Sequence, residues 1–116
     1  FSPQFAELWQ KEKWIELREK VTMKTMPLRE ILDQTVLKDT HIDFLNIDVE
    51  GLDREVLESN DWGRFRPSVI AIEAHGFCAD TPEQSTVYRY VREKGYTLYA
   101  VMKFSLIFVA IEEKMV

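Results

Sequence analysis

The stretch Ile42-Asp-Phe-Leu-Asn-Ile-Asp-Val-Glu-Gly51 decides the fold of this chain, because an apolar run ends there in two carboxylates and a glycine. Its few polar interruptions predict a strand over residues 42–48 that is buried on both faces, as in a parallel sheet. Side chains alternate along a strand, so Asp48 and Glu50 are expected to point to the same side. Gly51 permits the sharp turn that should follow. The pattern predicts a buried strand that delivers acidic groups to a crevice.

A second apolar run, over residues 68–72, repeats this plan and leads into Glu73, His75 and Gly76. Glu73 and His75 share a strand face, so the carboxylate could orient the imidazole; the plain alternative is a surface histidine without a task. Ligands of α/β sheets bind outside the carboxyl ends of the strands, where both runs end. The candidate catalytic residues are therefore Asp48, Glu50, Glu73 and His75.

The rest of the chain alternates helical and strand patterns. Helices are expected over residues 2–20, from residue 27 to before 39, after residue 51 as far as 60, and from a Thr81-Pro-Glu-Gln84 capping box to residue 94. Strands are expected over residues 21–25, 96–101 and 106–111, the last two as an antiparallel hairpin. This order predicts an α/β fold with a sheet that is parallel in its centre and is finished by the hairpin.

Composition bounds the function. The 116 residues suffice for one domain, over residues 1–116, and 46% hydrophobic with 30% charged residues is typical of a soluble globular protein. No apolar run approaches the roughly 18 residues that span a bilayer. The net charge of -5, with 15 basic residues scattered among 20 acids, argues against a nucleic-acid surface and favours small-molecule or protein partners. The single cysteine, Cys78, fits a reducing, cytoplasmic compartment.

These motifs carry a resemblance to a known family. The stretch over residues 42–51, followed by Glu55-Val-Leu57, Arg66-Pro-Ser-Val-Ile-Ala-Ile-Glu73 and Lys94-Gly-Tyr96, resembles the carboxyl-terminal half of the FkbM family of S-adenosylmethionine-dependent methyltransferases. The Val-x-x-Lys-Thr-x-x-Leu run over residues 21–28 is also similar to the family. The resemblance implies a partial class I methyltransferase sheet of the Rossmann-like kind, to which this chain supplies the fourth strand and everything after it.

The resemblance also implies S-adenosylmethionine as cofactor and a hydroxylated small molecule or sugar as methyl acceptor. Such enzymes cradle the cofactor on a glycine-rich loop, whereas the four glycines here are scattered, with no two within ten residues of each other. We therefore expect a segment that is inactive as an isolated chain. The alternative is a non-catalytic interaction or regulatory module derived from the same fold; a phosphoryl-transfer hydrolase with Asp48 as nucleophile ranks third.

Each candidate residue has a possible role. A hydroxyl acceptor needs a base, and Asp48 is favoured because the resemblance places it on the cofactor side, where it would also contact the cofactor. Glu50, Glu73 or His75 could serve instead, and Glu50 could equally cap the helix that follows it. Divalent cations favour such carboxylates, but a single Asp-x-Glu pair is too common to predict a metal site.

The class I order places the first strand beside the fourth. Without a first strand, residues 42–48 form an open apolar edge, and such edges tend to pair with another chain. We therefore expect this chain to self-associate through that strand.

Overall fold

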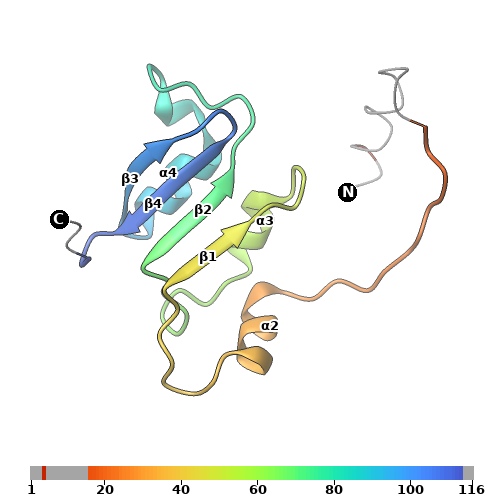
Figure 1. Cartoon of the computed structure of the whole chain (residues 1–116), viewed down its shortest axis with the longest axis horizontal. Helices are drawn as coiled ribbons and strands as arrows, with labels where there is room; N and C mark the ends of the chain where they lie inside the picture. Colours follow the sequence, from red (N-terminus) through yellow and green to blue (C-terminus); the bar gives the residue numbers. More distant parts are fainter. Residues whose placement is uncertain (1–3, 5–15, 114–116) are drawn as a thin grey trace.

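The computed structural model describes residue 4 and residues 16–113. They form a mixed α/β structure in which helices pack against a four-stranded sheet (Figure 1). The strands are β1 (Phe44–Ile47), β2 (Val69–Glu73), β3 (Tyr96–Val101) and β4 (Ser105–Ala110). The helices are α2 (Leu28–Thr35), α3 (Asp53–Glu58) and α4 (Thr86–Glu93), with a short 3₁₀ helix η1 (Pro82–Gln84) before α4. None of these helices has the length and apolarity needed to cross a membrane.

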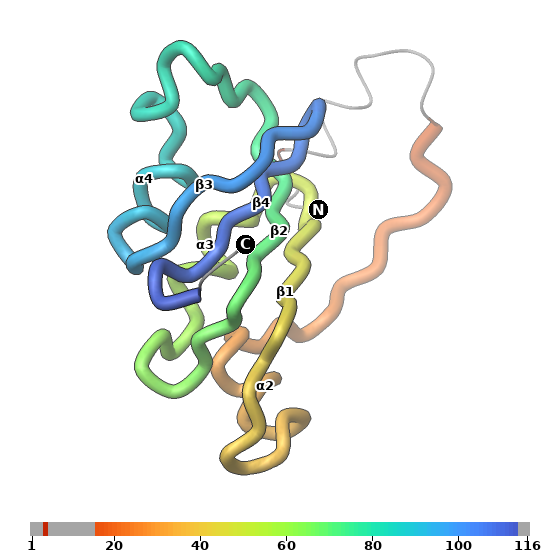
Figure 2. The backbone as a smooth tube through the Cα atoms, turned by 60° about the vertical axis from the view of Figure 1, so that its left-hand side comes forward, coloured from red at the N-terminus to blue at the C-terminus, as the bar shows by residue number. Residues whose placement is uncertain are grey.

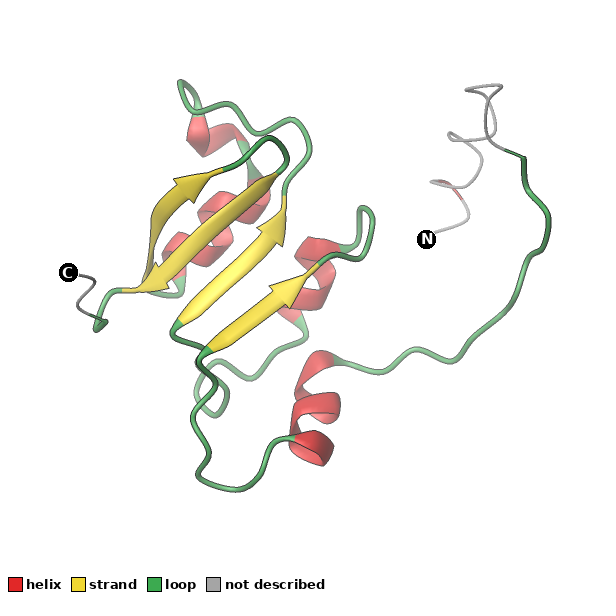
Figure 3. Ribbon diagram, viewed as in Figure 1, coloured by secondary structure: helices red, strands yellow, loops and turns green. Residues whose placement is uncertain are grey.

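The sheet has the order β1-β2-β4-β3, which confirms the predicted hairpin but not a parallel centre. β1 and β2 are parallel and lie at one side, while β4 runs antiparallel to both of its neighbours. The connection through α4 carries the chain past the position next to β2, and β4 then returns to fill that position. As a result β1, β2 and β3 share one direction, and their carboxyl ends meet at the same edge of the sheet (Figure 3).

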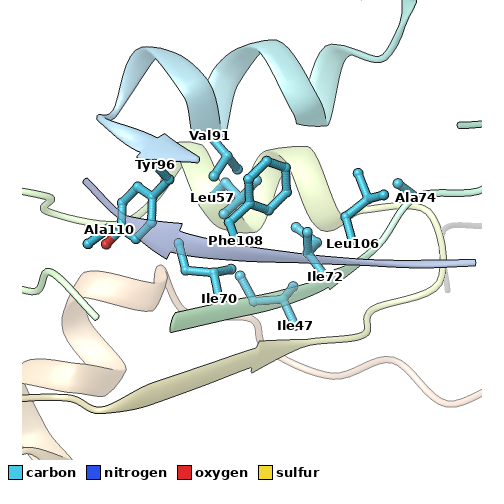
Figure 4. Close-up of a cluster of buried hydrophobic side chains, with 10 residues drawn as sticks. All are labelled: Ile47, Leu57, Ile70, Ile72, Ala74, Val91, Tyr96, Leu106, Phe108 and Ala110. Carbon is cyan, nitrogen blue, oxygen red and sulfur yellow. The ribbon is translucent and has the colours of Figure 1, made fainter. Parts of the chain in front are cut away.

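The core lies between the sheet and the pair α3 and α4. Alternate residues of the inner strands point to this face, and Leu57 of α3 and Val91 of α4 are completely buried against them (Figure 4). The strand residues in this core include Ile47, Ile70, Ile72, Leu106, Phe108 and Ala110. Burial of these apolar side chains supplies the main driving force that fixes the strand register.

The predicted burial of the first strand on both faces is wrong. Ile47 is 4% exposed on the helix-covered face, whereas Phe44 is 57% exposed and Asn46 is also exposed. Among the described residues, no helix covers the second face of β1, so its alternate side chains meet solvent. β1 lies at the outside of the sheet, as the tube in Figure 2 shows, and the predicted edge position is confirmed.

Residues 16–27 form an irregular, largely exposed segment (Figure 1). The predicted strand over residues 21–25 is wrong: Val21 is 68% and Met23 78% exposed, and no described strand pairs with them. Alternation of side chains is not sufficient for a strand without a partner for the backbone groups. The helix predicted over residues 2–20 does not include residues 16–20; apart from Gln4, which is helical, the rest of it lies outside the described residues.

The helix before β3 begins later than predicted. Ser85, not Thr81, is the N-cap of α4, and its hydroxyl accepts the backbone N–H of Tyr88 at 3.2 Å. Thr81 instead precedes η1 and makes no side-chain capping bond. Ser85 has an extended backbone, with ψ of 119°, which separates η1 from α4. The predicted capping box is therefore wrong, although the predicted end of the helix before Gly95 is confirmed.

Arg66 joins the amino-terminal end of β2 to the junction between α4 and β3. Its guanidinium donates to the carbonyl oxygens of Lys94 at 2.6 Å and Gly95 at 3.1 Å, and it pairs with the carboxylate of Glu112. It also lies over the ring of Tyr96, 4.7 Å from its centroid. Arg66 thereby satisfies the carbonyl group of Lys94, the C-cap of α4, and adds a second donor to the Gly95 carbonyl, which also accepts the backbone N–H of Ile111.

We predict that Arg66→Ala lowers the free energy of unfolding by about 2–3 kcal/mol, because hydrogen bonds from a charged donor and a cation–π contact are lost together. Urea denaturation measures the change. Arg89→Ala is the matched control, since Arg89 is an exposed arginine of α4 for which no side-chain partner is found among the described residues.

The ion pair between Arg66 and Glu112 makes the stabilisation by Arg66 depend on pH. Hydrogen bonding by Arg66 lowers the pKa of Glu112 to about 2. The stabilisation by the carboxylate is therefore complete above its ordinary pKa of about 4.3 and is lost as the pH falls toward 2. The difference between the wild type and Arg66→Ala should shrink over this interval. A difference that stays constant from pH 6 to pH 2 would contradict a contribution from Glu112.

Candidate active site

The segment Asp48–Gly51, called the first acidic tip below, is a tight turn. β1 ends at Ile47, and the chain then turns through Glu50 with φ of 51° and Gly51 with φ of 96°. A glycine adopts this left-handed conformation readily, but a non-glycine residue such as Glu50 does so at a cost of about 1 kcal/mol or more. The regular alternation expected for Asp48 and Glu50 therefore stops at Ile47, and the turn sets the positions of both carboxylates.

Asp53 holds this turn in place. Its carboxylate accepts the backbone N–H of Val49 at 3.3 Å and that of Gly51 at 3.2 Å, and the residue is only 6% exposed. The alternative role of Glu50 as a helix cap is wrong, because α3 has Leu52 as its N-cap and no side-chain capping bond. Asp53 did not appear among the residues predicted from the sequence. Its one local signal is an aspartate two residues after the glycine of the turn.

The segment Glu73–Gly76, called the second acidic tip below, begins at the last residue of β2. Glu73 Oε1 and His75 Nε2 are 2.8 Å apart, so the predicted pairing of this carboxylate with the imidazole is present in the structure. The ring of Phe104, from the turn between β3 and β4, lies against the imidazole with 4.8 Å between centroids. The backbone N–H of Ala74 donates to the carbonyl oxygen of Phe104 at 2.8 Å. His75 is thus oriented from two sides while its side chain stays 52% exposed.

The two tips converge. One potential ligand atom from each of Glu50, Glu73 and His75 lies within 4.8 Å of the others. Burial raises the pKa of Glu73, the neighbouring carboxylates of Asp48 and Glu50 raise it further, and His75 opposes them. The structure therefore brings all four candidate residues together at the carboxyl edge of β1 and β2.

A cavity of about 480 Å³ opens beside this acidic cluster. Glu73 and His75 line it, but Asp48 and Glu50 do not. The opposite wall comes from the loop after β2 and the start of α4, a region in which the sequence had indicated no site. Its polar and thiol side chains are Cys78, Thr81, Gln84, Ser85 and Thr86.

Cys78 is the single cysteine of the chain and is exposed at the wall of the cavity. Hydrogen bonding from the backbone of Asp80 lowers the pKa of its thiol, and the side chain and backbone of Thr81 lower it further. A lowered pKa increases the thiolate fraction at neutral pH, and because Cys78 is also exposed, its thiol can react with alkylating reagents.

The comparison with protein families decides the relationship. A family model described as the methyltransferase FkbM domain matches residues 2–98. The chain belongs to the FkbM methyltransferase family. Both acidic tips, the cavity wall and α4 lie inside the matched region. Searches among curated proteins and among solved structures each found no match for this FkbM chain.

We predict that Asp53→Ala releases the turn. Two backbone N–H groups lose their acceptor, so the free energy of unfolding should fall by about 1–3 kcal/mol. The amides of Val49 and Gly51 should also exchange their hydrogens faster, which NMR can follow residue by residue. Glu55→Ala is the matched control because Glu55 is an exposed acid of the same first turn of α3. Unchanged exchange at Gly51 in Asp53→Ala would show that Asp53 does not hold the turn.

Proposed function

We propose that this chain forms the acceptor side of an S-adenosylmethionine-dependent methyltransferase that methylates a hydroxyl group of a small molecule or sugar, on a class I methyltransferase sheet. The observation that carries the proposal is the convergence of Asp48, Glu50, Glu73 and His75 beside a cavity, in a chain of the FkbM family. Residues 1–116 would belong to one domain, and the cytoplasm would be its compartment.

The acidic cluster fits the charged part of the cofactor. S-adenosylmethionine, when bound, supplies a methyl group that its positively charged sulfonium already activates. The carboxylates of Asp48, Glu50 and Glu73 favour a positive charge at the carboxyl edge of the sheet. The 116 residues contain no glycine-rich loop for the nucleoside part of the cofactor. The proposed contact between this chain and the cofactor is therefore limited to the acidic edge, where Asp48 is the residue proposed to touch it.

The cavity fits a polar acceptor. Its volume of about 480 Å³ falls within the range of small-molecule sites, roughly 300–1,000 Å³. Hydroxyl and amide groups of Thr81, Gln84 and Thr86 line it and can exchange hydrogen bonds with a hydroxylated ligand. His75 and Glu73 form the side of the cavity that faces the acidic cluster. This arrangement supports a sugar or another hydroxylated small molecule as acceptor.

Proton removal is the chemical task of the chain. An acceptor hydroxyl must lose its proton when it is methylated, and a positioned carboxylate can take that proton. Glu73 and Glu50 are both half-buried, and Glu73 is engaged with His75, whereas Asp48 is exposed just after β1. Asp48 is therefore the proposed base, with the Glu73–His75 pair positioning the acceptor.

We predict that Asp48→Asn reduces the rate of methyl transfer at least about 100-fold, the usual contribution of a general base, and leaves acceptor binding intact. Transfer of radiolabelled methyl groups to a panel of hydroxylated acceptors measures the rate. Slower alkylation of Cys78 in the presence of an acceptor reports binding independently. Both the complete gene product and the 116-residue chain are tested, since the chain alone is expected to be inactive.

Asp43→Asn is the control, because Asp43 is exposed just before the same strand and lies outside the cluster. Full activity of Asp48→Asn would refute Asp48 as the base. Calorimetric titration with S-adenosylhomocysteine addresses the alternative function. If the complete protein binds neither S-adenosylhomocysteine nor S-adenosylmethionine, it is a non-catalytic interaction or regulatory module instead.

We also propose that the chain self-associates through β1. This strand is at the edge of the sheet, and Phe44 on its uncovered face is 57% exposed. An exposed apolar edge favours pairing with a second copy. Size-exclusion chromatography with light scattering should show a dimer or larger species at high concentration, and Phe44→Lys should shift it to monomer. A wild-type chain that stays monomeric at all concentrations would contradict the proposal.

A further inference from the structure

We propose that Glu50, Glu73 and His75 bind a divalent transition-metal cation such as Mn²⁺. The residues come from the ends of two neighbouring strands, and their potential ligand atoms lie within 4.8 Å of one another. Ligands on opposite sides of an octahedral ion with bonds of about 2.1 Å are about 4.2 Å apart, so only small side-chain movements would close the set. Because two of the three side chains are half-buried, they are already partly ordered.

The composition of the ligand set indicates the kind of ion. Carboxylate oxygens suit Mg²⁺, Ca²⁺ and Mn²⁺, whereas an imidazole nitrogen suits transition metals such as iron or zinc; Mn²⁺ is both a carboxylate-binding ion and a transition metal. The His75 side chain is 52% exposed, and it could turn from Glu73 toward a shared ion without disturbing the core. A mixed site of two carboxylates and one imidazole therefore favours Mn²⁺ over Ca²⁺.

A second observation is independent of the spacing of these ligands. Glu73 Oε1 faces His75, but Glu73 Oε2 is inaccessible to solvent and has no hydrogen-bond partner. A buried carboxylate oxygen without a partner is costly, and the negative charge of Asp48 beside Glu73 makes it more so. A cation would supply the missing partner and neutralise the surrounding carboxylates at the same time.

The competing occupant is a proton. A proton shared between Asp48 and Glu73 would also satisfy the buried oxygen and would leave His75 paired with Glu73 Oε1, but it would give Glu50 no part in the arrangement. A metal ion uses all three converging side chains and leaves the Asp48 carboxylate beside it outside the ligand set. The two occupants make different predictions, because a proton pair does not require His75.

The use of the ion in catalysis rests on the proposed function. A cation held by Glu50, Glu73 and His75 would make a bound acceptor hydroxyl more acidic, as a metal ion does for bound water, and the adjacent carboxylate of Asp48 would take the proton. The oxygen that loses this proton is the atom that receives the methyl group. Metal binding itself does not depend on methyl transfer and can be measured without it.

The test is a titration of the metal-free chain with Mn²⁺, followed by electron paramagnetic resonance of the free ion. We expect one Mn²⁺ per chain, at least tenfold weaker binding in Glu73→Gln and in His75→Asn, and wild-type binding in the control Glu93→Gln, an exposed acid of α4. Pulsed spectra should show coupling of bound Mn²⁺ to an imidazole nitrogen, and this coupling should disappear in His75→Asn.

Several outcomes would overturn the site. They are the absence of Mn²⁺ binding at millimolar concentration, equal binding in His75→Asn, and bound Mn²⁺ without nitrogen coupling. Circular dichroism establishes that the variants are folded, and His75→Asn keeps the test informative if Glu73→Gln is not, because His75 is exposed. Mn²⁺ binding by a complete gene product that transfers no methyl group would refute the proposed function alone, whereas metal-independent transfer by a complete gene product that does not bind Mn²⁺ would refute the site alone.

Discussion

The two backbone hydrogen bonds accepted by Asp53 are the constraint on which the acidic edge depends. They fix the turn between β1 and α3, which includes the left-handed residue Glu50. Each such bond contributes about 1 kcal/mol, enough together to offset backbone strain of about the same size. Asp53 also begins α3, whose Leu57 is completely buried against the sheet. Packing of the core and placement of the carboxylates are therefore linked through one short segment.

The sequence predicted most of the sheet because burial leaves a periodic pattern. In β2, β3 and β4 the apolar residues either alternate with polar ones or form a continuous run. Each of these strands also pairs with a neighbouring strand, and their apolar side chains are buried in the shared core. The convergence of Glu73 and His75 with the first acidic tip was also predictable, since parallel neighbours end at one edge. The segment at residues 21–25 has a similar pattern but no partner strand, and local pattern alone does not distinguish the two cases.

Other features leave no periodic signal. Asp53 acts through two hydrogen bonds to a turn, and any helix beginning with an acid looks the same in sequence. Ser85 and Thr81 are both favoured caps by residue type, and in the structure the extended backbone of Ser85 separates η1 from α4 and makes Ser85 the cap. The order of the strands depends on where the α4 connection returns, so the insertion of β4 next to β2 could not be derived from any single element.

The two ends of the sheet differ in how well their charges are satisfied. At the amino-terminal end of β2, Arg66 has its carbonyl acceptors, its carboxylate and an aromatic ring within contact. At the carboxyl end, Glu50 has a strained backbone. Glu73 Oε2 is one of two buried side-chain polar atoms among the described residues that have no hydrogen-bond partner. Deviations from local preference that coincide at one place are typical of a functional site. The unsatisfied charge at this edge is what the proposed cation would neutralise, whereas the satisfied charges at the other end help to hold the fold.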